Sequence, residues 1–209
     1  MQQSQASSNT SDVLVAAFPS RLAGDVRTVL EVMPVAAISP PGPFHVEVQG
    51  ETVTVPSRIY HGEPDDELEH FLTETQQMIL HCLYSRHSDG RVRQRRVAQI
   101  VGSSEPWVVP FVVQLAGEYV VEILEVIRQG LLDLDVPGSA QRGLYGDFIT
   151  RNPSFFARTE RRVVSYWSCY YRWKYPVFGT YPGGILAEAF RSAASERVGV
   201  PWPRHTPPC

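Results

Sequence analysis

Hydrophobic residues recur every three or four positions along much of the chain, which is the spacing of one face of an α-helix. The longest such stripe runs from Leu68 to Leu83. It follows the acidic opening Glu63-Pro64-Asp65-Asp66, whose carboxylates suit the N-terminal dipole of a helix. We therefore predict one helix that begins near Glu63 and ends near Arg86.

A second apolar stretch, Trp107 to Gln129, is hydrophobic around most of its circumference and carries only a narrow polar stripe. A helix of this kind is typical of the centre of a fold. Phe44 to Val55 instead alternates apolar and polar residues on either side of Gly50. That alternation predicts a β-hairpin with one face on the core.

Shorter helices are predicted from the same spacing and from capping residues, over residues 91–101, 141–151, 154–174 and 185–198. The fold class is therefore mainly α (α+β). It has a helical bundle-like core around the central apolar helix at about 107–129 and one β-hairpin at about 44–55. Residues 1–11 are polar and residues 201–209 are rich in proline, so we expect two tails on a single globular domain over 12–200.

Composition and charge limit the partners and the cellular location that we expect for the protein. The net charge of the 209-residue chain is -3, which argues against nucleic acid as a general partner without excluding a local basic face. There is no signal segment and no long apolar run free of carboxylates, so we expect a soluble, cytoplasmic protein with no membrane partner. The three cysteines lack the spacing of a disulfide framework or a zinc site.

The predicted end of the first long helix gathers side chains that are used in acid–base chemistry, namely His81, His87 and Asp89. Ser85 lies among them, but no Gly-x-Ser-x-Gly turn exposes it as a nucleophile. A histidine at a helix C-terminus also has a structural use, since it stabilises the helix dipole. We keep these three residues as candidates for an enzyme or a small-ligand site, and expect a protein that is not an enzyme.

Acidic residues Glu118, Glu122 and Glu125 recur on one side of the second long helix. A di-metal site in a helical bundle needs paired Glu-x-x-His motifs, and the chain has one, which starts at Glu67. We therefore expect no metal site and no cofactor. The stripe is predicted to be a solvated edge or to pair with arginines of the segment 91–96.

The chain is arginine-rich, because Lys174 is the single lysine among its nineteen basic residues. A basic patch is predicted on one side of the helix over 91–101, from Arg91, Arg93, Arg95 and Arg96. Residues 89–128 resemble one unit of a HEAT-type α-solenoid, but no second copy follows, and a solenoid needs several stacked units.

The helix predicted over 154–174 interleaves aromatic and basic side chains. A small fold cannot bury so many large rings on one helix, and aromatic and arginine side chains dominate the energy of protein interfaces. The expected partner-binding residues are Trp167, Tyr170, Tyr171, Arg172 and Trp173. Two alternatives are that the rings pack in the core and that they stack on the bases of a single-stranded nucleic acid.

These patterns favour a non-enzymatic interaction or assembly protein whose partner is a protein, either a second copy in a homo-oligomer or another chain. The first alternative is an enzyme or small-ligand-binding protein with a site near His81, His87 and Asp89. The second alternative is a nucleic-acid-associated regulator that uses the basic patch.

Overall fold

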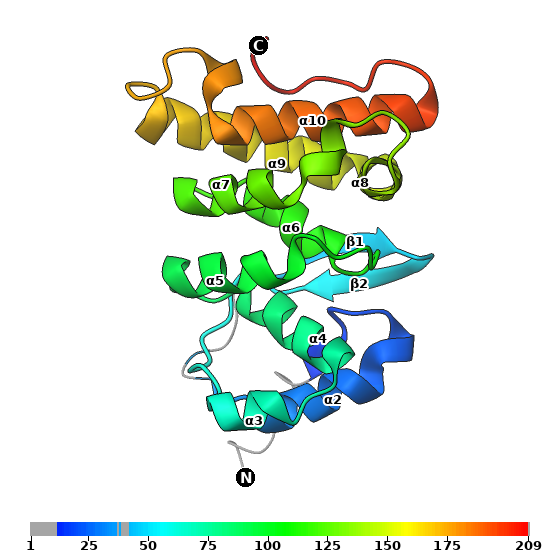
Figure 1. The fold of residues 1–209 in the computed structure, drawn as a ribbon, viewed down its shortest axis with the longest axis vertical. Helices are drawn as coiled ribbons and strands as arrows, with labels where there is room; N and C mark the ends of the chain where they lie inside the picture. The colour runs from blue at the N-terminus through cyan, green and yellow to red at the C-terminus, as the bar shows by residue number, and fades with distance from the viewer. Residues whose placement is uncertain (1–11, 37, 39–41, 209) are drawn as a thin grey trace. The chain divides into compact units, whose positions relative to one another are not determined.

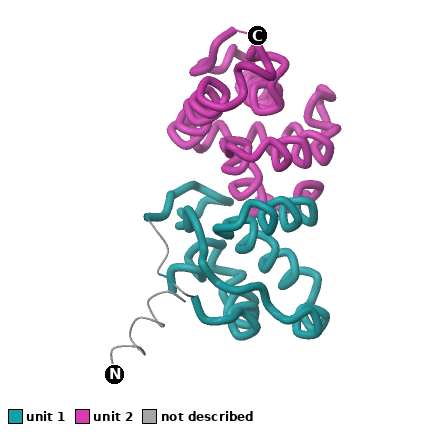
Figure 2. The backbone as a smooth tube through the Cα atoms, turned by 90° about the vertical axis from the view of Figure 1, so that its left-hand side faces the viewer, with its two compact units in different colours: residues 1–100 teal, residues 101–209 magenta. Residues whose placement is uncertain are grey.

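The computed structural model describes residues 12–36, 38 and 42–208. The chain forms two compact units, which are residues 1–100 (unit 1) and 101–209 (unit 2) (Figure 2). The predicted fold class is confirmed, since the described residues are mainly helical with one two-stranded antiparallel sheet (Figure 1). The single domain over 12–200 stays a prediction, and the N-terminal tail lies outside the described residues.

Unit 1 combines the hairpin with short helices. Its elements are η1 (Ser20–Leu22), α2 (Ala23–Val32), β1 (Phe44–Val48), β2 (Glu51–Val55), α3 (Asp66–His70), α4 (Glu74–Tyr84) and α5 (Gly90–Ile100). The helix α4 packs against both α2 and α5. The hairpin has the predicted bounds, and its turn places Gln49 and Gly50 at positive φ. A buried Ile59 makes a parallel bridge to His87 and so joins the segment after β2 to the end of α4.

The helix predicted from Glu63 to Arg86 is wrong in one respect, because the structure divides it into α3 and α4. Thr73 begins α4 with a capping box, in which its hydroxyl accepts from the Gln76 amide and the Gln76 side chain accepts from the Thr73 amide. The stripe is broken as a result. Leu68 is 44% exposed and Phe71 is 85% exposed, whereas the apolar residues from Ile79 onward are buried.

Unit 2 is helical. Its elements are α6 (Val109–Ala116), α7 (Val121–Gly130), η2 (Leu132–Asp135), α8 (Ala140–Arg151), α9 (Pro153–Tyr166), the π-helical turn η3 (Trp167–Tyr171), η4 (Phe178–Thr180) and α10 (Pro182–Val198). The helix α10 packs along α8 and contacts α7 and α9. Gly146 permits that approach, because a Cβ at this position would lie 2.7 Å from the Ala193 carbonyl oxygen.

The second long helix, predicted from Trp107 to Gln129, is also two helices, α6 and α7. The break follows Gly117, and Val120 is extended. Two polar contacts hold the link outside helical geometry. The buried Glu118 carboxylate pairs with Arg162 at 3.8 Å, and the Tyr119 carbonyl accepts a hydrogen bond from the Tyr171 hydroxyl at 2.6 Å.

The proline-rich C-terminal segment does not trail from the fold over its described part. The Trp202 amide donates to the Ser195 hydroxyl, Arg204 pairs with Glu188, and Arg191 donates to the Thr206 hydroxyl at 2.9 Å. The segment therefore lies back along α10. Among the described residues, no helix has the length and the apolar character that crossing a membrane requires.

Candidate functional site

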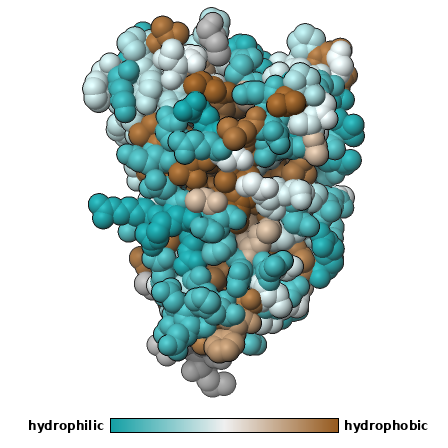
Figure 3. Space-filling view, viewed as in Figure 1, coloured by the Kyte–Doolittle hydropathy of each residue, from teal (hydrophilic) through white to brown (hydrophobic). Residues whose placement is uncertain are grey.

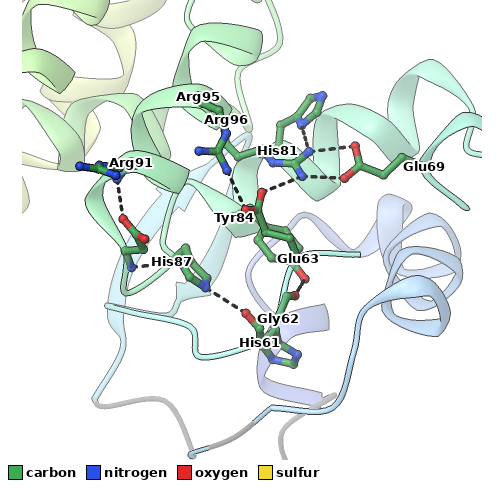
Figure 4. Close-up of polar contacts among 11 residues, drawn as sticks. His61, Gly62, Glu63, Glu69, His81, Tyr84, His87, Arg91, Arg95 and Arg96 are labelled. Carbon is green, nitrogen blue, oxygen red and sulfur yellow. Dashed lines mark hydrogen bonds and ion pairs between the residues drawn. The ribbon is translucent and has the colours of Figure 1, made fainter. Parts of the chain in front are cut away.

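Unit 1 contains a cluster of charged side chains around Arg96, which we call the ionic cluster (Figure 4). It consists of Glu63, Glu69, His81, Tyr84, Arg95 and Arg96. The guanidinium of Arg96 makes a bidentate pair with Glu69, with distances of 2.6 and 2.9 Å, and its Nη2 also lies 3.3 Å from Glu63. Its Nη1 lies 3.2 Å from Nδ1 of His81. Every terminal nitrogen of Arg96 is therefore engaged by groups of its own unit.

An aromatic ring completes the surroundings of Arg96. The guanidinium carbon lies 5.4 Å from the centre of the Tyr84 ring, a cation–π distance. Tyr84 is buried, and its hydroxyl donates to the Gly62 carbonyl at 2.5 Å. Burial raises the pKa of Tyr84, and the pKa of Arg96 is also raised, because its hydrogen bonds to Glu69 and Glu63 outweigh the cost of burial.

The tautomer of His81 follows from its contact with Arg96. Arginine has only donors, so Nδ1 of His81 accepts and the proton of the neutral ring is on Nε2. Burial and the neighbouring Arg96 charge lower the pKa of His81 to about 4. The neutral ring borders a cleft of about 480 Å³, which is lined by Glu63, Asp66, Glu69, His81, Arg95, Arg96 and Gln99.

The structure does not bring the three candidate acid–base residues into one constellation. His87 donates from Nε2 to the His61 carbonyl at 2.9 Å and accepts at Nδ1 from the Asp89 amide at 3.0 Å. Asp89 accepts from the Arg91 amide at 2.8 Å and so caps α5. His87 and Asp89 thus fix the turn between α4 and α5, while His81 belongs to the ionic cluster.

The four arginines of the predicted basic patch have different surroundings. Arg93 is buried, and its guanidinium donates to the carbonyls of His87 and Ser88 at 2.9 Å. Arg95 pairs with Glu63 at 2.6 Å, and Arg96 is the centre of the ionic cluster. Three of the four are therefore engaged within unit 1, which reduces the support for a continuous cationic face on α5.

The acidic stripe is also divided. Glu118 is buried in the link between α6 and α7, and Glu125 pairs with Arg128 one turn along α7 at 2.9 Å. Within the described ranges, no group of three His, Cys, Asp or Glu side chains is arranged to hold a metal ion.

Unit 2 presents the second candidate site at the end of α9. The π-helical turn changes the direction of successive side chains, and π-turns of this kind are frequent at functional sites. Trp167 points inward, is 9% exposed, and makes an edge contact with Phe178. Tyr171 is half-buried and stacks on Tyr181. These two predicted partner-binding residues thus hold the turn in place.

The other predicted partner-binding residues are exposed. Trp173 is 81% exposed, Tyr170 is 59% exposed, and the neighbouring Val177 is 57% exposed. The exposed cations Arg172 and Lys174 flank Trp173. We call these five residues the aromatic–basic segment. Neither cation has a carboxylate partner within the described residues.

Unit 1 exposes a second set of hydrophobic residues, which the sequence assigns to the apolar stripe of one long helix. Leu68 and Phe71 lie three positions apart at the end of α3, and the exposed carboxylates near them in the sequence are Asp66, Glu67 and Glu74. These five residues are the acidic α3 surface. In the described part of the chain, these three carboxylates have no cationic partner. Figure 3 shows one face of the molecule, on which hydrophobic side chains lie among hydrophilic ones.

Comparison with known proteins does not assign this chain to a family. No protein-family model, no curated protein and no solved structure matches it.

Proposed function

We propose that this protein is a non-enzymatic assembly protein that self-associates through the aromatic–basic segment of unit 2. The observation that carries the proposal is Trp173, a large hydrophobic ring that is 81% exposed and held in one orientation. Its indole N–H donates to the Tyr170 carbonyl at 2.9 Å, so the polar edge of the ring is satisfied and its hydrophobic faces are open to a partner.

The segment is pre-organised, which favours binding because few rotamers are lost on association. Trp167 donates from its indole nitrogen to the Tyr175 carbonyl at 2.8 Å. Tyr171 donates to the Tyr119 carbonyl at 2.6 Å, which ties the π-helical turn to the link between α6 and α7. Tryptophan, tyrosine and arginine are the side chains most enriched among the energetically dominant residues of interfaces.

The two alternatives have less support. In the ionic cluster, the charged groups of Glu63, Glu69 and Arg96 satisfy one another, so a small ligand would have to compete with those pairs. On α5, one arginine is buried and two are paired with carboxylates, which leaves little free cationic charge for phosphate groups. Both alternatives remain predictions.

The test is native mass spectrometry and sedimentation velocity over a wide range of protein concentration. We expect masses at multiples of 23.4 kDa that increase with concentration. Trp173→Ala should weaken association by about 2 kcal/mol, or roughly thirtyfold, as expected for an anchor residue.

The matched control is Leu132→Ala, which truncates another hydrophobic residue of unit 2 that is 75% exposed. It should leave association unchanged. A wild-type protein that stays monomeric at every concentration would refute the proposal, and so would equal loss of association in the two variants.

A further inference from the structure

We infer that the acidic α3 surface of one copy is the docking site for the aromatic–basic segment of a second copy. The inference rests on the proposed self-association and names the second half of that interface. It begins from a feature that folding alone does not explain, since Phe71 is 85% exposed and Leu68, three positions before it, is 44% exposed.

The break between α3 and α4 creates this surface. Glu67 lies four positions before Phe71, and Glu74 lies three positions after it. Residues four positions apart are neighbours on a helical surface, so Glu67 borders the exposed ring, whereas Glu74 is the first residue of α4, after the break. In a protein without a partner here, an exposed phenylalanine beside a carboxylate contributes no core packing.

The two surfaces are complementary in charge as well as in hydrophobicity. The acidic α3 surface carries Asp66, Glu67 and Glu74, none of which has an ion pair among the described residues. The aromatic–basic segment carries Arg172 and Lys174, which also lack carboxylate partners there. Docking would bury both hydrophobic sets and pair the charges at the rim, where such pairs set orientation and association rate.

This contact joins two different surfaces, so it is heterologous. Each copy keeps one unused surface after a single contact, so repeated contacts give either a closed ring, of which a reciprocal dimer is the smallest, or an open chain. A contact between two copies of the aromatic–basic segment would instead bring four cations together, and the like charges would repel.

The experiment combines two truncations, Phe71→Ala and Trp173→Ala, each of which disables one surface. Sedimentation velocity on each variant alone should show association weakened at least roughly tenfold. An equimolar mixture should form a 1:1 dimer and nothing larger, because the mixture contains one intact pair of surfaces per two chains. Circular dichroism verifies that each variant is folded.

A charge reversal gives a second readout. Glu67→Lys should weaken association, and adding salt to the wild-type protein should weaken it as well. The matched control is Glu31→Lys, which reverses another exposed carboxylate of unit 1, at the end of α2. That variant should associate as the wild type does.

The outcomes separate the two proposals. If Trp173→Ala abolishes association while Phe71→Ala and Glu67→Lys do not, the protein self-associates but the acidic α3 surface is not its docking site, and this inference is overturned alone. A mixture of the two truncations that remains monomeric also overturns it. If the wild-type protein does not associate, both proposals fail.

Discussion

Arg96 in unit 1 and Arg172 in unit 2 both lie over an aromatic ring, at 5.4 Å from Tyr84 and 5.4 Å from Trp167, yet their surroundings are opposite. Arg96 is 11% exposed at its side chain and is engaged by two carboxylates and a histidine. Arg172 is exposed, and no carboxylate of the described chain pairs with it. The same pairing of arginine with an aromatic ring is therefore part of a partly buried ionic cluster in one unit and is exposed to solvent in the other.

The difference comes from what the rest of the chain supplies. In unit 1 the carboxylates of Glu63 and Glu69 reach α5 from 33 and 27 positions away, so the cationic charge is neutralised inside the fold. In unit 2, carboxylates pair with arginines other than Arg172. Glu160, for example, is buried and accepts two hydrogen bonds from Arg191, and burial raises its pKa despite that pair.

The largest expected effect tests the role of Arg96 in stability. Arg96→Met leaves Glu69 and Glu63 without their partner in a partly buried cluster, and we expect the free energy of unfolding to fall by about 3 kcal/mol. Arg95→Met is the matched control. Its side chain is 58% exposed, so its pair with Glu63 should contribute less than about 1 kcal/mol. Urea unfolding measures both, and equal losses would contradict the comparison.

An intermediate effect concerns pH and His81. Its pKa is about 4 in the folded protein and near 6.5 when unfolded, so the unfolded chain binds more protons between these values. Stability should be constant above pH 6.5 and fall as the pH is lowered toward 4. The pKa of His61 is lowered by burial and adds a loss of the same sign.

The variant His81→Asn tests this prediction. The amide oxygen of asparagine can accept the hydrogen bond from Arg96, but the side chain does not titrate. Urea unfolding at several pH values should show a shallower acid loss than in the wild type. An unchanged slope would mean that the pKa of His81 is the same in the folded and the unfolded protein.

The smallest expected effect is that of Arg172→Met on the monomer. An exposed cation over a ring contributes about 0.5 kcal/mol, and no ion pair is lost. The measurement is urea unfolding at a protein concentration too low for association. A loss as large as that from Arg96→Met would show that Arg172 is a structural residue and would remove it from the docking surface.

Much of the secondary structure could be predicted from local patterns. The alternation around Gly50 predicted the hairpin, and Asn152 with Pro153 marked the start of α9. The break before α4 also had a local signal, since Thr73 and Gln76 have the spacing of a capping box. The hydrophobic stripe concealed it, because Leu68 and Phe71 continue the helical spacing without being buried.

The candidate sites were harder to predict, for a physical reason in each case. The ionic cluster depends on pairing between residues far apart in the sequence, which no local pattern reveals. The sequence places the aromatic residues on one helix, but the π-helical turn decides which are exposed, and it turns Trp167 inward while Trp173 stays outside. The arginines along α5 did not by themselves predict an exposed basic patch, because Arg93 is buried against carbonyl groups of the preceding turn.

The exposure of Trp173 also gives the protein its own optical reporter. The chain has four tryptophans; Trp107 and Trp167 are buried, Trp202 is half-buried, and Trp173 alone of the four is largely in water. Its indole should emit at the longest wavelength and be the most readily quenched by acrylamide. Any event that covers this ring should shift the emission to the blue, so the occupancy of the segment can be followed in the unlabelled protein by fluorescence.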